Sequence, residues 1–396
     1  MKILFLTSRF PYPPYGGDKL RVFNFIKYLS RKHEIHLISF IESENEKKYL
    51  AEMEKYCKRI EIVLLSPGKS YLNCAAFSIT NLPFQVAYYR DSSMRGKVDE
   101  MIRGENYDAA YVHLMRMAQY VYGCNSVNRV LDLTDSLSLS LFRSLKYRRH
   151  VFFLFYFLEW LKVKRYERAA VKVFERSLLI SSADTCSETL LAAGEKISIV
   201  GNGVDLGYFK PSNGPYDKDK IAFVGNMHSF PNRDGVLYFC DRILPVIRKR
   251  RPDMKFYVIG ANPPDKIKKL DDGKTVFVTG PVDDTRKYLN DAVALVCPIR
   301  TATGMQNKIM EAMSMGLPVI STKISAQWLE DSDRAGIILA DNEEEFAKAV
   351  LSVVENDNLR HELSLQARRY SEDNFSWDGN IEKLEKSMTR GANGDS

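Results

Sequence analysis

The stretch ALVCPIRTATGMQNKIMEAMSMGLPVIS, residues 294–321, decides the fold of the second half of the chain. It opens with a short apolar run that suits a buried strand, and a polar loop follows. From residue 307 the spacing of apolar residues is typical of a helix. Gly316 can end this helix in a left-handed conformation, and Pro318 prevents its continuation. The stretch therefore predicts a strand, a loop, a helix and a second strand.

Short apolar runs alternate with amphipathic stretches over the whole chain, and this alternation predicts parallel sheets flanked by helices. We expect strands at residues 2–6, 35–40, 60–64, 109–112, 130–133, 178–180 and 197–200, and then at 221–224, 256–259, 276–278, 294–297, 318–321 and 336–339. We expect helices at residues 19–30, 44–56, 159–174, 235–248, 284–290, 307–315, 343–353 and 358–370. The fold class is α/β, with two Rossmann-like doubly wound domains.

The polar segment at residues 211–220, with two prolines, one glycine and four charged residues, separates the two series of strands. A chain of 396 residues suits two domains of Rossmann size. We therefore predict an N-terminal domain at 1–205, a linker at 206–220 and a C-terminal domain at 221–375. Two such domains in series leave a cleft, and ligands of doubly wound sheets bind outside the carboxyl ends of the strands.

Composition excludes several classes of protein. The net charge of +7 is mildly basic and lacks the dense Lys/Arg clusters of a nucleic-acid binder. The six cysteines form no CxxC pair, so neither a zinc site nor a disulfide framework is predicted. Residues 1–6 lead directly into polar residues, unlike a signal peptide, and the apolar run at 151–158 is shorter than a spanning helix. We expect a cytoplasmic protein.

The loop at residues 298–306 and the helix after it carry the groups of a phosphate and ribose site. Gly304 lets the backbone approach a ligand closely. Free amides at a helix N-terminus attract a diphosphate, and they are expected at Met305, Gln306 and Asn307. Arg300 and Lys308 flank this position with positive charge, and Glu311, about one turn into the helix, can accept from two ribose hydroxyls. An ordinary capped Rossmann helix is the alternative.

Gly304 and the segment at residues 311–320 closely resemble the signature of retaining GT-B glycosyltransferases of family 4, the group 1 glycosyltransferases. That signature has two glutamates separated by seven residues, followed by Gly-x-Pro-Val. Glu311 matches the second glutamate, which implies that it binds the donor ribose. The first glutamate, which in much of the family faces the donor sugar, is replaced by Thr303.

Residues 223–239 and 243–245 are similar to a branch of this family that is associated with exopolysaccharide sugar transfer. The resemblance implies donor-binding roles for Gly225 and Asn226. Asn226 stands where the family has a phosphate-binding arginine, and Arg233 lies near the position of its lysine. Arg300 and Lys308 are the candidates for the missing charge. A plain helix-initiating turn at 230–232 is the alternative.

The first domain contributes candidates beside its first and fourth strands. Gly16 and Gly17 follow the first strand, and the resemblance implies that their amides approach the donor across the cleft; a flexible turn is the alternative. His113 ends the strand at 109–112, and the resemblance implies a group that polarises the reacting sugar or positions the acceptor. A lone histidine is more often structural. Asp132 and Asp135 either face the cleft or cap the next helix.

The resemblance implies a hexosyl-transferring glycosyltransferase that uses a UDP- or GDP-linked sugar, a glycan or lipid-linked acceptor, and no metal or cofactor, in polysaccharide or glycolipid biosynthesis. Arg300, Lys308 and the helix amides would stabilise the leaving diphosphate, with His113 as the further catalytic candidate. The alternatives are a nucleotide-sugar epimerase or a non-catalytic binding protein on the same fold. No GxGxxG follows the first strand of either domain, which argues against a dinucleotide-dependent oxidoreductase.

Residues 146–165 place aromatic residues between basic clusters, a pattern that is plausible for a segment lying at a membrane interface. We expect peripheral contact with the inner face of the membrane, with a buried helix of the first domain as the alternative. In GT-B enzymes a final helix crosses back onto the first domain. The resemblance implies such a helix at about 376–390, with Trp377 at the crossing.

Overall fold

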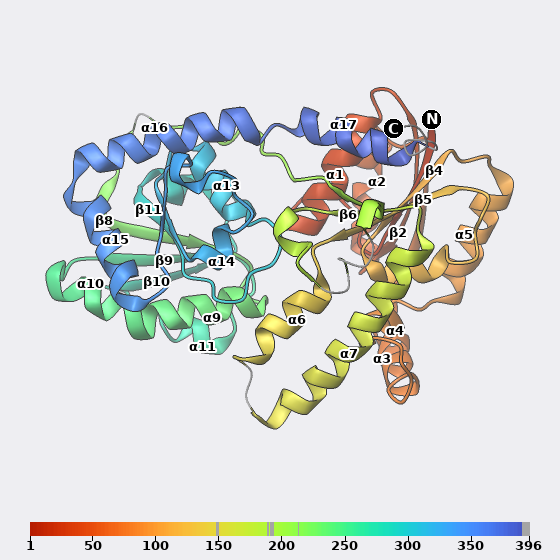
Figure 1. The fold of residues 1–396 in the computed structure, drawn as a ribbon, viewed down its shortest axis with the longest axis horizontal. Coiled ribbons are helices and arrows are strands. Elements are labelled where there is room, and N and C mark those ends of the chain that lie inside the picture. The colour runs from red at the N-terminus through yellow and green to blue at the C-terminus, as the bar shows by residue number, and fades with distance from the viewer. Residues whose placement is uncertain (148–149, 188–189, 191–193, 213, 390–396) are drawn as a thin grey trace. The chain divides into compact units, whose positions relative to one another are not determined.

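The computed structural model describes residues 1–147, 150–187, 190, 194–212 and 214–389. The chain divides into two compact units. Unit 1 comprises Met1–Gly201 together with Asp378–Ser396, and unit 2 comprises Asn202–Trp377. Each unit is built on its own parallel sheet, with helices packed against the sheet (Figure 1).

The sheet of unit 1 has the strand order β3-β2-β1-β4-β5-β6-β7, and all of its paired strands are parallel. The strands are β1 (Lys2–Thr7), β2 (Glu34–Ile41), β3 (Arg59–Leu64), β4 (Ala109–His113), β5 (Asn128–Thr134), β6 (Arg176–Leu179) and β7 (Ile197–Ile199). Each coincides with an expected strand to within a few residues. The apolar runs are buried on both faces, as strands of a parallel sheet covered by helices should be.

The core of unit 1 lies on both sides of β1. Leu4 and Leu6 belong to one buried cluster that includes Val98 and Val163 from the helices. Phe5 points the other way, because successive side chains of a strand alternate, and its ring lies 4.6 Å from that of Tyr111. All these side chains are buried, so the sheet is covered on both faces.

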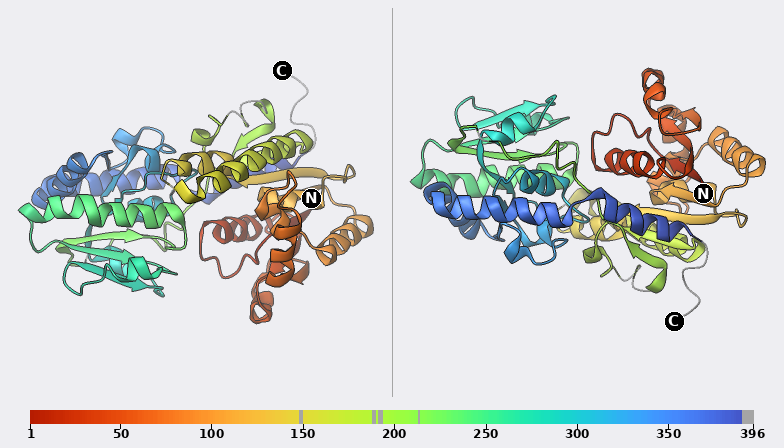
Figure 2. Two further views of the ribbon diagram at one scale, coloured as in Figure 1. Left: turned by 90° about the horizontal axis from the view of Figure 1, so that it is seen from below. Right: turned by 90° about the horizontal axis from the view of Figure 1, so that it is seen from above.

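The helices of unit 1 are α1 (Gly17–Leu29), α2 (Leu50–Met53), α3 (Pro67–Ala76), α4 (Phe84–Tyr88), α5 (Ser92–Gly104), α6 (Leu137–Leu145), α7 (His150–Val173) and α17 (Trp377–Met388), the last of which begins at the end of unit 2. Helix α7 starts nine residues earlier than the expected position 159, so the apolar run at 151–158 is helical. Helices α6 and α7 pack side by side (Figure 2). No described helix is long and apolar enough to cross a membrane.

Helix α17 returns the chain to unit 1. The side-chain amide of Asn128 donates to the Met388 carbonyl at 2.8 Å, and His33 Nε2 lies 2.9 Å from a carboxylate oxygen of Glu385. Unit 2 ends at Trp377, at the start of this helix. Residue 390, the end of the helix expected at 376–390, lies outside the described residues.

The sheet of unit 2 has the strand order β10-β9-β8-β11-β12-β13, again with parallel pairs throughout. The strands are β8 (Asp217–Val224), β9 (Lys255–Ile259), β10 (Val276–Gly280), β11 (Ala292–Cys297), β12 (Val319–Ser321) and β13 (Ile337–Leu339). The linker expected at 206–220 is wrong at its C-terminal end, because β8 begins at Asp217. Charged residues can occupy this end of the strand, since Asp217 pairs with Lys255 on β9.

The helices of unit 2 are α9 (Phe230–Tyr238), α10 (Leu244–Arg250), α11 (Asp265–Lys268), α12 (Arg286–Asn290), α13 (Asn307–Ser314), α14 (Lys323–Ala326), α15 (Glu343–Glu355) and α16 (Asp357–Asn374). A π-helical turn at Phe239–Ile243 joins α9 to α10. Helix α13 packs against α16, while α10 packs against α15 (Figure 1). The buried core between the helices and the sheet includes Phe223, Phe239 and Phe256.

Candidate functional site

In each unit the strand order reverses between two neighbouring strands. In unit 2 these are β8 and β11, because the chain winds from β8 towards β10 and then from β11 towards β13. In unit 1 they are β1 and β4. Loops that leave two such strands diverge at their carboxyl ends, which is where doubly wound folds bind ligands. Most of the sequence-predicted site residues lie in or directly after these loops. Lys308 and Glu311 lie within helix α13, His113 is the last residue of β4, and Asp132 and Asp135 lie in and after β5.

The loop between β11 and α13 presents backbone donors. Gly304 has a φ of 62°, in the left-handed region that glycine adopts without strain. Helix α13 then begins at Asn307, with Gln306 as its N-cap residue and no side-chain cap. Among the described residues, no acceptor pairs with the amides of Met305, Gln306 and Asn307. These donors are therefore available to an anionic ligand at the positive end of the helix dipole.

Lys308, in the first turn of α13, is half-buried and held by a neutral partner. Its ammonium donates to Asn232 Oδ1 at 2.6 Å and lies 4.5 Å from the centre of the Phe223 ring. Burial lowers the pKa of Lys308. An amide oxygen does not neutralise the ammonium, so Lys308 keeps a charge that a phosphate can compensate.

Arg300 is arranged differently from the cation that the sequence predicts for the phosphates. Its guanidinium donates to both carboxylate oxygens of Asp234, at 2.9 and 2.7 Å, and lies 4.4 Å from the centre of the Tyr238 ring. The planar fork of arginine matches a carboxylate in this bidentate way. Asp234 therefore compensates the charge of Arg300 in this structure, and the phosphate-binding role of Arg300 stays a prediction.

Asn232 links the loop after β8 to helix α13. Besides accepting from Lys308, it donates from Nδ2 to the Asn226 carbonyl at 2.9 Å. A Cβ atom at Gly225 would lie 2.7 Å from the Asn232 side chain, so this contact requires glycine. Sequence reasoning treated Asn232 only as part of a helix-initiating turn. Asn232 has a role at the site because it pairs with Lys308, a residue 76 positions away. No local sequence pattern indicates this pairing.

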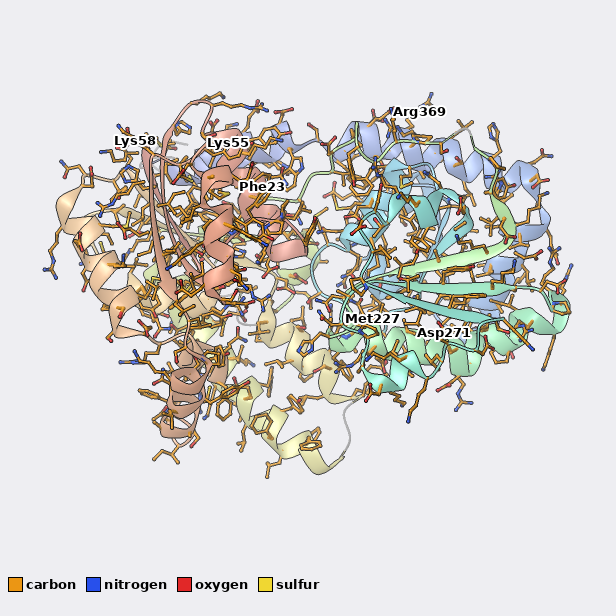
Figure 3. The ribbon with its side chains drawn as sticks, turned by 180° about the vertical axis from the view of Figure 1, so that it is seen from behind. Phe23, Lys55, Lys58, Met227, Asp271 and Arg369 are labelled. Atoms are coloured by element: carbon orange, nitrogen blue, oxygen red, sulfur yellow. The ribbon has the colours of Figure 1, made fainter. Side chains whose placement is uncertain are left out.

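Asn226 stabilises its own loop, and its side-chain Oδ1 accepts from the His228 amide at 2.9 Å. The adjacent Met227, labelled in Figure 3, donates its amide to the Ala261 carbonyl at 2.9 Å. Arg233 donates to the His228 carbonyl at 2.8 Å. This loop is therefore held in one conformation beside β8 by hydrogen bonds to side chains and backbone.

Glu311 lies one turn beyond Lys308 on α13 and is half-buried. No hydrogen-bond or ion-pair partner occupies its carboxyl group among the described residues. Burial raises the pKa of Glu311 to about 7, and the charge of Lys308 opposes this effect. A carboxyl group without a partner can accept hydrogen bonds from sugar hydroxyls. Thr303 is buried in the preceding loop, where its carbonyl accepts from the Gln306 side chain.

In unit 1, Gly16 and Gly17 lie at the start of α1 and are exposed. Gly16 is the N-cap residue, with a φ of 92° that only glycine adopts readily. His113 ends β4 and is buried, with no hydrogen-bond partner for its Nε2 atom among the described residues. Burial lowers the pKa of His113 to about 4, against the opposing charges of Asp132 and Asp18, so its ring is neutral at pH 7.

Asp132 lies inside β5, and its side chain is fully buried. It accepts from Arg21 Nε at 2.6 Å, from the Tyr111 hydroxyl, and from the Thr134 amide at 2.8 Å. The Arg21 charge lowers the pKa of Asp132 despite the opposing effect of burial. This buried ion pair joins α1 to β5, which gives Asp132 a structural role.

The groups at the end of β11 are polar amides, a lysine and a carboxyl group, and they suit a diphosphate and a ribose. Among the described residues, no group of three or more His, Cys, Asp or Glu side chains is placed to hold a metal ion.

Comparison with known proteins agrees with this reading of the fold. HepE from Anabaena in complex with UDP superimposes with a TM-score of 0.68 at 16% identity, covering 98% of this chain and 99% of that chain. Sucrose-phosphate synthase from Thermosynechococcus elongatus has a TM-score of 0.72 at 14% identity, covering 98% of both chains. The protein therefore has the GT-B fold, an α/β architecture of two Rossmann-like domains.

The sequence comparisons indicate the class of protein more specifically than the fold does. A family model described as glycosyl transferases group 1 matches residues 218–356, which include the site of unit 2. An uncharacterized 44.6 kDa protein in the cps region of Klebsiella pneumoniae is 23% identical over 399 residues, covering 94% of this chain and 96% of that protein. Residues 218–356 are therefore similar to the group 1 glycosyltransferases, which supports a glycosyltransferase function.

Proposed function

We propose that the protein is a retaining glycosyltransferase that transfers a hexose from a UDP- or GDP-linked donor to a glycan or lipid-linked acceptor in polysaccharide or glycolipid biosynthesis. The observation that carries this proposal is the set of unpaired amides at the start of α13, with Lys308 beside them and Glu311 one turn further on. The complex of HepE with UDP and the cps-region relative support the donor class and the pathway class.

In this proposal each group acts on a separate part of the donor. The amides of Met305, Gln306 and Asn307 and the Lys308 ammonium bind the diphosphate and stabilise the charge that develops when it leaves. Glu311 accepts hydrogen bonds from the ribose hydroxyls. Gly225 and Asn226 line the same edge, and Thr303 lies where the sugar would begin. No metal or cofactor is required, because amides and an ammonium supply the positive potential.

The reaction breaks the bond between the anomeric carbon and the diphosphate oxygen and forms a bond from the acceptor oxygen to the same carbon. In a retaining displacement on one face, the proton of the acceptor hydroxyl passes to the departing phosphate oxygen. His113 is neutral at pH 7, so in unit 1 it can accept or donate a hydrogen bond to a sugar hydroxyl. Gly16 and Gly17 provide further backbone donors.

The donor site is tested by titrating UDP and GDP into the wild type, Lys308→Gln and the control Lys249→Gln. Lys249 is an exposed lysine in the last turn of α10, at the opposite end of the strands. Removing the Lys308 charge should weaken nucleotide binding about tenfold, the value of a charge-assisted hydrogen bond. Equal affinities in all three proteins would refute the site. Release of epimerised sugar without acceptor would instead favour a nucleotide-sugar epimerase.

We also propose that residues 146–165 contact the membrane peripherally, with residues 148–149 outside the described part of the chain. The first half of α7 exposes large apolar side chains, namely Phe152, Phe153, Leu154, Phe155 and Leu158. Its second half packs into the core through residues such as Val163, as the alternative of a buried helix requires. Ile79 is 95% exposed, and it lies beside this helix because the carbonyl before it accepts from Lys162 at 2.7 Å.

The membrane contact is tested by cosedimentation with vesicles containing phosphatidylglycerol. The variant Phe153→Ser/Leu154→Ser removes two exposed apolar side chains and should reduce binding at least tenfold, because insertion at the interface depends on buried apolar area. Val173→Ser, at the exposed C-terminal end of the same helix, is the control. Unchanged sedimentation of the double variant would contradict the proposal.

A further inference from the structure

Arg116 follows β4 in unit 1, in the 3-10 helix Met115–Tyr120 at the point where the strand order reverses. Its Nε donates to the Ser8 hydroxyl at 2.9 Å, and its guanidinium lies 4.8 Å from the centre of the Tyr89 ring. Within the described part of the chain, no carboxylate lies within 4 Å of it, and its two terminal nitrogens have no acceptor. Arg116 is therefore a positioned cation without a direct carboxylate partner.

Several arginines of unit 1 have direct acceptors, while Arg31 and Arg90, which also stack on aromatic rings, have none among the described residues. Arg21 is paired with Asp132, Arg129 with Glu175, and Arg9 with both Asp18 and Glu42. The terminal nitrogens of Arg95 donate to backbone carbonyls. Arg116 is half-buried, and burial lowers its pKa while the charges of Asp18 and Glu42 oppose this effect. Its two terminal nitrogens can therefore donate to a ligand at the end of β4.

Two buried polar atoms beside Arg116 lack partners as well. Thr7, which ends β1, has an unpartnered hydroxyl, and His113, which ends β4, has an unpartnered Nε2 atom. Both side chains are more than nine-tenths buried. Thr7 adjoins Ser8, the residue that holds Arg116, and the pKa of His113 responds to the Arg116 charge. Thr7 and His113 end neighbouring strands of the sheet, and Arg116 follows the second of these strands.

The backbone at this edge is strained. Leu114, between His113 and Arg116, has a φ of 69°, which non-glycine residues seldom adopt. Its amide donates to the Asp132 carbonyl at 2.7 Å, which holds it in that conformation. Backbone strain of this kind is common at functional sites. The conformation of Leu114 determines the direction in which the backbone leaves β4 towards Arg116.

We propose that Arg116, together with Thr7 and His113, binds a singly charged oxyanion on the acceptor, either a uronate carboxylate or a phosphodiester. The inference rests on the proposed function, because it names the class of that acceptor. A planar guanidinium binds such a group through two parallel hydrogen bonds. Asp18 and Glu42 are engaged with Arg9 and leave Arg116 unpaired, but their nearby charges disfavour a dianion.

The experiment titrates the full chain with glucuronate, dimethyl phosphate and neutral glucose at constant ionic strength. Arg116→Gln should weaken binding of one charged probe about tenfold, and Arg116→Lys should weaken it less because the charge remains. The probe that binds identifies carboxylate or phosphodiester as the source. Arg31→Gln is the control, since Arg31 also stacks on a tyrosine ring but follows α1 at the amino ends of the strands. Neither probe binding the wild type, or equal binding to Arg116→Gln, overturns the proposal.

A second variant and a second ligand complete the test. Ser8→Ala removes only the acceptor of Arg116 Nε and should weaken the charged probe about threefold, near the lower end of the value of one hydrogen bond, with an unchanged melting temperature. UDP affinity should stay within twofold in every variant. If Arg116→Gln weakens UDP as much as the charged probe, the oxyanion belongs to the donor and the proposal fails. If the wild type binds the probe but neither UDP nor GDP, the proposed function fails while the anion site stands.

Discussion

The two strand-order reversals, β1/β4 in unit 1 and β8/β11 in unit 2, share one topology but arrange charge differently. In unit 1 the ion pair of Arg21 and Asp132 is fully buried beneath the strand ends. In unit 2 the two basic side chains are only half-buried, with Lys308 on an amide and Arg300 on Asp234. The first arrangement joins elements of the core, and the second lies in loops and at a helix terminus.

This difference predicts whether a substitution should change the stability of the protein or its affinity for a ligand. A charge that is fully buried contributes to stability only together with its partner, so removal of one partner is costly. A half-buried lysine that is paired with a neutral amide is partly solvated. Removing its charge should therefore chiefly lower the affinity for an anion. We therefore expect substitutions of the Arg21–Asp132 pair in unit 1 to lower stability and substitution of Lys308 in unit 2 to lower ligand affinity.

The largest effect is expected for Asp132→Leu. The substitution leaves the Arg21 charge buried and unpaired, and it should lower the free energy of unfolding by about 3–5 kcal/mol. Urea denaturation followed by circular dichroism measures the change. The double variant Arg21→Met/Asp132→Leu should recover most of the loss, because an apolar pair avoids the desolvation cost. A double variant as unstable as the single one would show that the pair is not the cause.

Gly260→Ala tests the backbone packing that holds the loop after β8. Gly260 has a φ of 140°, and a Cβ atom there would lie 2.0 Å from the Gly225 carbonyl oxygen. Strain and displacement together should cost about 2–4 kcal/mol of stability and also weaken UDP binding. Gly96→Ala is the control, because Gly96 lies inside α5, where an added Cβ atom would meet no other atom within 4 Å. That control should gain about 0.5–1 kcal/mol; a loss of stability there would contradict this account.

His113 should make unit 1 sensitive to acid. Its folded pKa of about 4 lies below the ordinary value of 6.5, so its contribution to stability is present above pH 6.5 and is lost as the pH falls through about 4. The expected change is on the order of 2–3 kcal/mol. Denaturation between pH 7 and pH 4 should show a shallower decline for His113→Asn than for the wild type. Parallel curves would mean that His113 is not the titrating group.

Glu311 should give unit 2 the opposite and smaller dependence on pH. Its folded pKa of about 7 lies above the ordinary value of 4.5, so the stability contributed by its neutral form is present below pH 4.5 and is lost as the pH rises through about 7. Because the group is half-buried, we expect about 1–2 kcal/mol. Glu311→Gln should remove this loss between pH 5 and pH 8, as measured by urea denaturation. A pH dependence identical to that of the wild type would assign the effect elsewhere.

The strands were predictable because of how parallel sheets are buried. Strands such as β1 and β11 are covered on both faces and therefore read as continuous apolar runs. Helices α3 and α4 were not predicted, since they are short and bury few apolar residues. Helix α5 was missed although its buried residues follow a helical spacing, and α6 was anticipated only as the helix after Asp135. Helix α7 was expected only in its second half, because the exposed aromatic residues of its first half interrupt the pattern of a buried face.

Within the candidate site, the sequence by itself determined what is local along the chain. Gly304, the start of α13 and the glycine that ends it follow from neighbouring residues, and so do the donors that the helix terminus presents. The partners of the charged groups depend on the tertiary structure. Arg300 pairs with a residue 66 positions away, Lys308 with one 76 positions away, and Arg21 with one 111 positions away. Packing of the strands decides these distances, and with them which charge is compensated and which is left for a ligand.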